Sequence, residues 1–312
     1  MSVIKTEFSF PSTNGINTVR GVRYLPADGQ CKAVLQISHG MVEHYDRYDD
    51  FMNYMAENGF AVYMHDHIGH KHSVDNDEQL GYFAEDEGYK CILNDLYHTA
   101  MMAKEENPGK KYFLLGHSMG SFYARVFASQ YTDIIDGVII SGTGGPNKAA
   151  AMGGKLVRLL IKLKGDRYRS GFVNNMAFGE YLKKIENPET PSDWITRDKE
   201  IVKEYVADKY CQFVFTLSGF RDLMDIMGQS NDKQTFENTP DSLPVYIFSG
   251  SMDPVGDYGI GVLNVVDGYK TAGCTDVQVK IYDGGRHEML NEINRREVYD
   301  DVKNWLCEKA EA

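Results

Sequence analysis

Residues 112–128 read YFLLGHSMGSFYARVFA and join an apolar run typical of a buried strand to a stretch with helical spacing. Between the two halves, Gly116 and Gly120 each stand two positions from Ser118. A sharp turn from strand to helix leaves no room for Cβ atoms beside its central residue, and it lifts that residue clear of the sheet. The stretch therefore predicts a strand, a tight turn and a helix, with Ser118 as a candidate nucleophile at the turn.

The rest of the chain alternates short apolar runs with helical patterns. TEFSF and TVRGVRYL, on either side of PSTNGIN, predict an opening antiparallel hairpin. Six further runs predict central strands: AVLQISHG, FAVYMHD, YFLLGHS, GVIISGT, LPVYIFSG and VQVKIYDGG. Helical spacing follows at residues 48–58, 89–106, 118–131 and 290–309. We expect an α/β protein with a mostly parallel central sheet and helices on both faces.

Residues 146–235 break this alternation, because they are richer in charge and contain no convincing buried strand. We interpret them as an inserted helical cap on a core formed by residues 1–145 and 236–312. A predicted cap helix at 149–164 carries leucines along one side and basic residues largely on the other: Leu156, Leu159, Leu160 and Leu163 against Lys155, Arg158, Lys162 and Lys164. This is either a surface helix packed on the core or a lid helix that offers its apolar face to an acyl chain or, transiently, to a lipid surface.

Composition excludes several classes of protein. With 33 basic and 45 acidic residues the net charge is −12, which argues against a nucleic-acid partner. The five cysteines are scattered and form no C-x-x-C pair, so neither a disulfide framework nor a cysteine zinc site is expected. The N-terminal stretch MSVIKTEFSFPS lacks the apolar run of a signal peptide, and no window reaches the ~18 apolar residues of a membrane span. We therefore expect a cytoplasmic protein.

A serine hydroxyl is a poor nucleophile unless a base removes its proton and an acid orients that base. When the nucleophile sits on such a turn, the chain order is serine, acid, histidine. His287 is the one histidine after Ser118, and it follows the last predicted strand. Asp253 lies in the loop after the preceding strand; Asp257 in the same loop and Asp283 are its rivals. We prefer Asp253 as the acid.

Stabilising an oxyanion requires two N–H donors that point at the same place. One donor is expected from the residue after the nucleophile, Met119. The other should come from the loop after an earlier strand, where His39-Gly40 precedes Met41. Gly40 relaxes the backbone, so that the N–H of Met41 can turn inward. We interpret His39 as a structural side chain that braces this loop.

The stretch YMHDHIGHKHS, residues 63–73, contains four histidines and raises the alternative of a zinc hydrolase. His65, His67 and His70 would be its ligands. Metallo-β-lactamase-like enzymes use H-x-H-x-D-H, however, and here Gly69 occupies the acidic position. Such an enzyme would also leave the glycine-flanked serine unexplained. We therefore expect His67 and His70 to brace loops near the nucleophile, with no metal and no cofactor.

Five motifs in this order carry a resemblance to a known family: HGMVEHYDRY, HDHIGHKHS, LLGHSMGS, SGSMDPV and GGRHEMLNE. Together they resemble the monoacylglycerol lipase and lysophospholipase branch of the α/β-hydrolases, a group often labelled serine aminopeptidase S33. The resemblance covers residues 20–145 and 240–309. It implies an α/β-hydrolase fold, with the following site residues: Ser118 as nucleophile, Asp253 as acid, His287 as base, and the N–H groups of Met41 and Met119 as oxyanion donors.

The resemblance further implies a serine carboxylester hydrolase that acts through an acyl-enzyme on small-molecule acyl esters, with monoacylglycerols or lysophospholipids as the expected class. An amidase, a peptidase or a short-chain esterase could use the same triad, and a binding module that kept the turn by descent is a further alternative. The sequence departs from the family pattern at two positions. Lys71 replaces the last glycine of D-H-x-G-H-G-x-S, and Ser121 stands where glycine or alanine is common.

Overall fold

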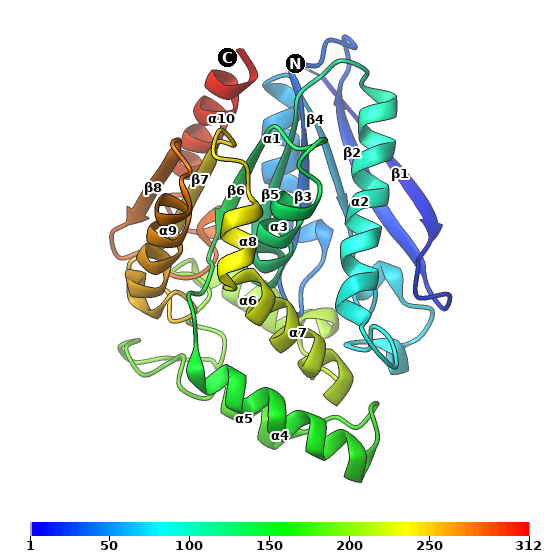
Figure 1. Cartoon of the computed structure of the whole chain (residues 1–312), viewed down its shortest axis with the longest axis vertical. Coiled ribbons are helices and arrows are strands. Elements are labelled where there is room, and N and C mark those ends of the chain that lie inside the picture. Colours follow the sequence, from blue (N-terminus) through cyan, green and yellow to red (C-terminus); the bar gives the residue numbers. More distant parts are fainter. Residues whose placement is uncertain (1, 312) are drawn as a thin grey trace.

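The fold is built on one eight-stranded sheet, in a computed structural model that describes residues 2–311, with the side chains of 148–151 left undescribed. Its strand order is β1-β2-β4-β3-β5-β6-β7-β8 (Figure 1). The strands are β1 (Val3–Pro11), β2 (Thr18–Pro26), β3 (Ala33–Ser38), β4 (Phe60–His65), β5 (Tyr112–His117), β6 (Gly137–Ser141), β7 (Val245–Gly250) and β8 (Val277–Tyr282).

The strand pairing confirms the predicted hairpin and the predicted parallel sheet. Strands β1 and β2 pair antiparallel, β2 joins β4 antiparallel, and all remaining neighbours are parallel. One expectation is wrong: VQVKIYDGG does not form a central strand. In the part of the chain that the structure describes, strand β8 pairs only with β7, and it is largely half-buried or exposed because it forms an edge of the sheet.

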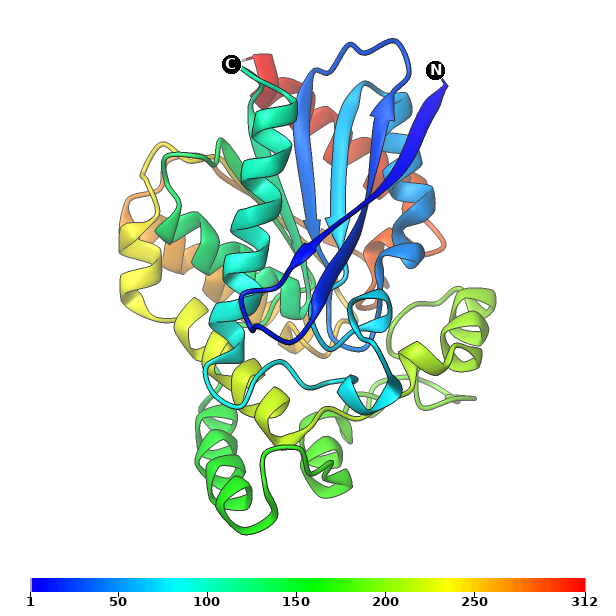
Figure 2. The same cartoon turned by 90° about the vertical axis from the view of Figure 1, so that its right-hand side faces the viewer.

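Helices cover both faces of the sheet (Figures 1 and 2). Helices α2 (Gly88–Glu106), α3 (Met119–Gln130) and α9 (Ile260–Ala272) pack on one face, and α1 (Asp49–Glu57) and α10 (Arg295–Glu311) pack on the other. The helix predicted after Ser118 is confirmed as α3, and its residues from Met119 to Ser129 are buried. The sequence prediction omitted α9, and it began the last helix too early, since a 3-10 turn at Met289–Asn291 precedes α10.

Residues 146–235 contribute mainly helices, which lie below the sheet in Figure 1. They include α4 (Lys148–Lys164), α5 (Gly171–Phe178), α6 (Lys199–Ala207) and α7 (Leu217–Ser230), followed by α8 (Lys233–Asn238). Helix α4 packs on α7, and α7 packs on α3, the helix that follows Ser118. These helices therefore cover the end of the sheet that carries Ser118; the division into core and cap stays a prediction.

Helix α4 turns its two sides to different surroundings. Gly153 and Val157 are buried against neighbouring helices, whereas Leu159 and Leu163 are 53% and 68% exposed. The predicted leucine side is therefore split, because contact with α7 sets the rotation of the helix. The side chains of residues 149–151, at the start of the predicted cap helix, lie outside the described residues. Across residues 2–311, no helix has both the length and the apolarity needed to span a bilayer.

Candidate active site

Ser118 occupies the tight turn between β5 and α3. Its backbone angles are φ 52° and ψ −119°, a conformation that residues other than glycine rarely adopt. A Cβ added at Gly116 would lie 2.3 Å from the carbonyl oxygen of Gly120, and one added at Gly120 would lie 2.0 Å from that of Ser38. Both glycines are therefore required for the chain to turn this sharply, and the strain is localised at the serine.

His287 and Asp253 form a buried pair. The Nδ1 of His287 lies 2.9 Å from Oδ1 of Asp253. The carboxylate also accepts hydrogen bonds from the Ser249 hydroxyl and the Val255 N–H, each at 2.9 Å. Because a carboxylate can only accept, Nδ1 carries the proton and Nε2 presents its lone pair. Of the three candidate acids, Asp253 is the one that the structure places against the imidazole.

The pair shifts the titration of both groups. Burial by itself lowers the pKa of His287, but the negative charge of Asp253 and the hydrogen bond to it raise the pKa above its ordinary value. Burial likewise raises the pKa of Asp253, yet the facing imidazole and the two other donors hold it below its ordinary value. The acid therefore stays ionised at neutral pH, which is the state that orients a basic imidazole.

The loop after β3 brings Met41 toward the serine. A Cβ at Gly40 would lie 3.0 Å from Cβ of Ser118, so the loop and the nucleophile are in close contact. Among the described residues, no backbone hydrogen bond uses the N–H of Met41 or of Met119. Both residues line the cavity that contains Ser118. Two free donors beside one hydroxyl are what an oxyanion site needs.

The buried histidines in the loops after β3 and β4 form hydrogen bonds with other groups of the protein. His39 accepts the His67 N–H through Nε2 at 2.9 Å and lies 2.7 Å from the Gly40 carbonyl through Nδ1. His67 reaches the Ser38 hydroxyl at 3.0 Å, and His70 accepts the Val42 N–H at 3.4 Å. Burial lowers the pKa of His70 to about 4, and it lowers those of His39 and His67 well below the ordinary value. These imidazoles are therefore neutral and act as braces between loops.

The zinc alternative required His65, His67 and His70 to converge. The rings of His65 and His67 do lie 5.3 Å apart, but Nδ1 of His65 faces the Thr99 hydroxyl at 2.9 Å, while His67 binds the Ser38 hydroxyl and His70 the Val42 N–H. Within residues 2–311, none of the three belongs to a group of side chains close enough to share a metal ion.

Sequence reasoning missed a buried ionic network behind the site. Arg47 pairs with Glu43 at 3.0 Å and with Glu288, the neighbour of His287, at 2.6 Å. Glu43 also accepts the N–H of Gly40 and the hydroxyl of Tyr48. Burial raises the pKa of Glu288, but the Arg47 charge outweighs this and lowers it to about 2. The signal was present in HGMVEHYDRY, where Glu43 and Arg47 stand four residues apart.

Trp194 is a second residue that the sequence did not single out. Its ring centroid lies 5.0 Å from that of His287, and its carbonyl oxygen accepts a hydrogen bond from the backbone N–H of His287 at 3.4 Å. The neighbouring carbonyl of Ile195 accepts the N–H of Glu288 at 2.7 Å. A segment of the predicted cap is therefore hydrogen-bonded directly to the loop that carries the histidine.

A cavity of about 410 Å³ extends from Ser118 into the helices of residues 146–235. Ser118, His287, Met41 and Met119 line one part of it. Its remaining wall is mostly apolar and is formed by side chains such as Phe178, Phe220, Leu223, Met224 and Met227. A concave, largely apolar site with a few polar groups at one end suits a substrate that is itself mostly apolar.

Comparison with known proteins agrees with this geometry. The family model described as serine aminopeptidase, S33, matches residues 29–294. The chain belongs to this family. The S33 hydrolase is similar to the monoacylglycerol lipase of Mycolicibacterium smegmatis, with 26% identity over 98% of each chain. It is also similar to human monoglyceride lipase, with 23% identity over 92% of this chain and 86% of that one.

A carboxyl esterase from Bacillus coagulans, solved in complex with glycerol, has the same fold as the S33 hydrolase. The two share 30% identity with a TM-score of 0.92, over 98% of this chain and 99% of that one. The fold is thus the α/β-hydrolase fold that the motifs implied, and the chain is a hydrolase of the lipase and esterase type.

Proposed function

We propose that this hydrolase cleaves monoacyl esters of the monoacylglycerol or lysophospholipid type through an acyl-enzyme. Ser118 Oγ attacks the ester carbonyl while Nε2 of His287 takes its proton, and Asp253 stabilises the resulting imidazolium. The N–H groups of Met41 and Met119 stabilise the oxyanion. The imidazolium then protonates the leaving alcohol, and a water molecule, activated by the same histidine, releases the fatty acid.

The observation that carries this proposal is the apolar cavity that begins at Ser118. Burying one methylene group is worth roughly 0.8 kcal/mol, so an acyl chain gains affinity with each carbon that fits the cavity. The lining of methionines adapts to a flexible chain, because the thioether side chain is unbranched and polarisable. The related esterase was solved with glycerol, which is the leaving group of a monoacylglycerol.

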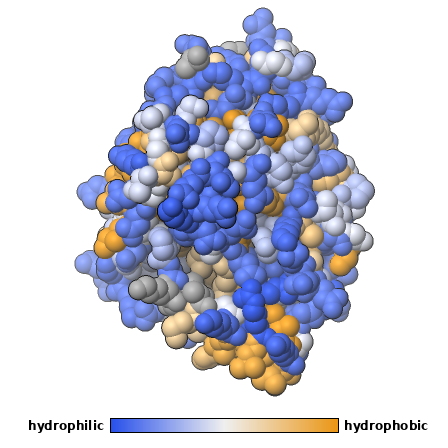
Figure 3. Space-filling view, viewed as in Figure 1, coloured by the Kyte–Doolittle hydropathy of each residue, from blue (hydrophilic) through white to orange (hydrophobic). Residues whose placement is uncertain are grey.

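A transient contact with a lipid surface is part of the proposal. Leu159 and Leu163 on α4 and Phe172 on α5 are more than half exposed. Helices α4 and α5 lie at the bottom of the molecule (Figure 1), where the space-filling view shows an apolar area (Figure 3), and Lys155 and Lys162 are exposed on α4. An apolar face flanked by lysines favours the boundary between headgroups and acyl chains. Such a face would bring the cavity close to a membrane-dissolved substrate.

The test is a series of p-nitrophenyl esters from acetyl to palmitoyl, assayed beside monoacylglycerols and lysophospholipids. We expect kcat/KM to rise as the acyl chain is lengthened from acetyl to octanoyl and above. We expect turnover to fall by a factor of about 10⁶ in Ser118→Ala. A preference for acetyl would identify a short-chain esterase. Faster cleavage of the matched anilides would identify an amidase. Hydrolysis that persists in Ser118→Ala would rule out the proposed nucleophile.

A further inference from the structure

Val42, next to the proposed donor Met41, has a backbone that a β-branched residue rarely adopts. Its φ is +57°. Such a conformation persists only where the surroundings hold it. Two hydrogen bonds do so: the N–H of Val42 donates to His70 at 3.4 Å, and its carbonyl accepts the hydroxyl of Tyr205 at 3.2 Å. The direction of the Met41 N–H therefore depends on a contact that comes from α6.

Tyr205 links α6 to the ionic network as well. The guanidinium of Arg47 lies over its ring, 4.7 Å from the centroid. Arg47 in turn binds Glu43 beside Gly40 and Glu288 beside His287. Tyr205 of α6 thus contacts the loop after β3 directly, and it contacts the loop that carries His287 through Arg47.

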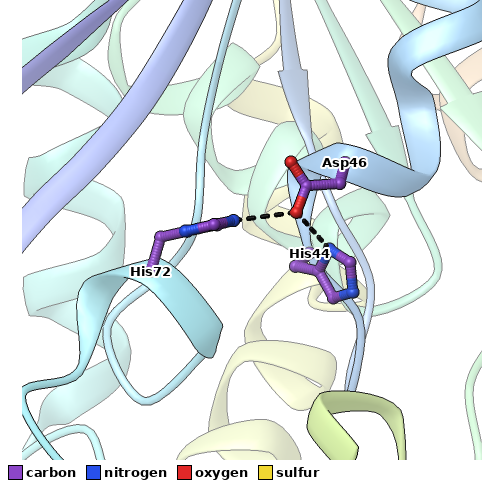
Figure 4. Close-up of side chains that lie close together, drawn as sticks. All are labelled: His44, Asp46 and His72. Atoms are coloured by element: carbon purple, nitrogen blue, oxygen red, sulfur yellow. Dashed lines mark hydrogen bonds and ion pairs between the residues drawn. The ribbon is translucent and has the colours of Figure 1, made fainter. Parts of the chain in front are cut away.

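The end of α6 is fastened by a cluster of carboxylates, histidines and one lysine, of which Figure 4 shows His44, Asp46 and His72. Asp208, the residue after α6, accepts Nε2 of His44 at 2.8 Å and lies 3.8 Å from Nζ of Lys71. Asp46 is 2.8 Å from Lys71, 2.8 Å from Nε2 of His72 and 3.3 Å from Nδ1 of His44. The cluster therefore joins the loop after β3, the loop after β4 and the end of α6.

Lys71 supplies the cation between the two carboxylates. Burial alone would lower its pKa, but Asp46 raises the pKa above the ordinary value, so the ammonium stays charged. It also lies 5.4 Å from the ring centroid of Tyr210, beyond the end of α6. Nδ1 of His44, Oδ2 of Asp46 and Nε2 of His72 lie within 4.8 Å of one another and are ligand types that suit a transition metal. The ammonium, however, already neutralises Asp46 from within the chain.

We propose that Lys71 is a positioning residue, which holds Asp208 against Asp46 and thereby keeps Tyr205 on the strained turn that directs the Met41 N–H. The inference rests on the proposed function, since Met41 matters only if an oxyanion forms beside Ser118. Lys71 stands where the family pattern has glycine, so this chain carries a fastening that the pattern lacks.

The experiment compares Lys71→Met, Lys71→Arg and the control Lys199→Met on hydrolysis of p-nitrophenyl octanoate. Lys199→Met removes the same charge from the exposed start of α6, where Glu189 is the one ion-pair partner of the lysine among the residues that the structure describes. Loss of a complete oxyanion donor costs ~10²–10³ in kcat, so we expect about a tenfold loss for its misdirection in Lys71→Met. We expect KM to stay within about twofold, because the donor acts mainly in the transition state.

Three further readings separate positioning from general loosening of the fold. Lys71→Arg should recover most of kcat, and inactivation by a fluorophosphonate should slow in Lys71→Met by the same factor as kcat. Tyr205→Phe should reproduce the loss, and the double variant should be no slower than the slower single variant. Three results would each overturn the proposal. They are an unchanged kcat in Lys71→Met, equal losses of kcat in Lys71→Met and Lys71→Arg, and losses that multiply in the double variant Lys71→Met/Tyr205→Phe.

Two controls make every outcome decisive. If Lys71→Met does not fold, as judged by circular dichroism, Asp208→Asn takes its place with the same expected kcat loss. Wild-type activity that does not depend on Ser118 would defeat the proposed function, whereas Ser118-dependent activity that is unaffected in Lys71→Met defeats only this inference. Stoichiometric zinc binding to the wild type by calorimetry, lost in His72→Gln, would show that a metal takes the place assigned to the ammonium.

Discussion

Arg47 binds Glu288 through two parallel hydrogen bonds, with Nη1 2.7 Å from Oε1 and Nη2 2.6 Å from Oε2. The Arg47 side chain is only 11% exposed, and its second carboxylate partner is Glu43. Glu43 lies in the loop after β3, which carries the proposed donor Met41, and Glu288 follows His287. The Arg47 side chain therefore fixes the spacing between these two loops. Bidentate pairing of this kind adds geometric definition that a lysine could not provide.

Replacing Arg47 by methionine should be strongly destabilising. The variant keeps most of the side-chain volume but leaves two buried carboxylates without their cation. Removing one partner of a buried ion pair typically costs about 3–5 kcal/mol. The measurement is urea unfolding, with Arg296→Met as the control, because Arg296 is exposed. An Arg47→Met protein as stable as the control would show that the network contributes little to the fold.

The sequence was sufficient for the parts of the fold that are set locally. The turn at Ser118 was predictable because its two glycines are required by contacts of 2.0–2.3 Å. Five central strands were found because buried parallel strands are near-continuously apolar. The sixth run, β8, was wrongly placed in the centre, although its polar residues Gln278 and Lys280 alternate with apolar ones, as is typical of a partly exposed edge strand. Helix α9 was recoverable: Val262, Val265, Val266 and Tyr269 follow helical spacing and are buried.

The contacts between distant segments were not predictable from the sequence. Asp208 forms ion pairs with Lys71 and His44, which both lie more than a hundred residues earlier in the chain. Trp194 lies on His287 for the same reason: the path of residues 146–235 over the sheet determines the contact, and no local pattern encodes it. The rotation of α4, which exposes Leu159 and Leu163, is likewise set by its partner α7.

The pH dependence of kcat/KM should show an acid limb above pH ~6.5, the ordinary value for histidine. Asp253 stabilises the protonated form of His287, so its pKa is raised despite burial. The imidazolium therefore persists to higher pH, and activity falls as the pH decreases through that raised value. The measurement is kcat/KM for p-nitrophenyl butyrate between pH 5 and 9. A midpoint below ~6.5 would contradict the assignment of His287 as the base.

Asp253→Asn should lower kcat by about 10⁴, because an asparagine can hold the imidazole in the wrong tautomer. It should also move the acid limb to lower pH, since the substitution removes the largest interaction that opposes the effect of burial on the pKa of His287. Asp257→Asn is the matched control from the same loop and should keep near-normal turnover. Loss of turnover in Asp257→Asn, with Asp253→Asn unaffected, would reverse the assignment of the acid.

Gly153→Leu should shorten the acyl chain that the enzyme accepts. Gly153 lines the cavity, and a Cβ there would lie 3.2 Å from Cε of Met224, a flexible tip that can move. We expect kcat/KM for dodecanoyl esters to fall at least tenfold while that for acetyl esters stays within about twofold. Gly154→Leu is the control, since this neighbour lies outside the cavity lining. Equal losses for both ester lengths would indicate a general packing defect instead of a filled cavity.

The double variant Leu159→Ser/Leu163→Ser should weaken contact with lipid surfaces without impairing the chemistry. Both side chains are mostly exposed, so the folded state loses few contacts. Burying a leucine is worth roughly 1.5–3 kcal/mol, and partial insertion of two of them predicts at least a tenfold loss of vesicle binding. Co-sedimentation with phosphatidylcholine–phosphatidylglycerol vesicles measures this, and p-nitrophenyl butyrate turnover should be unchanged. Leu263→Ser, an exposed leucine on α9, is the control. Equal vesicle binding by the wild type, the control and the double variant would show that α4 does not contact the bilayer.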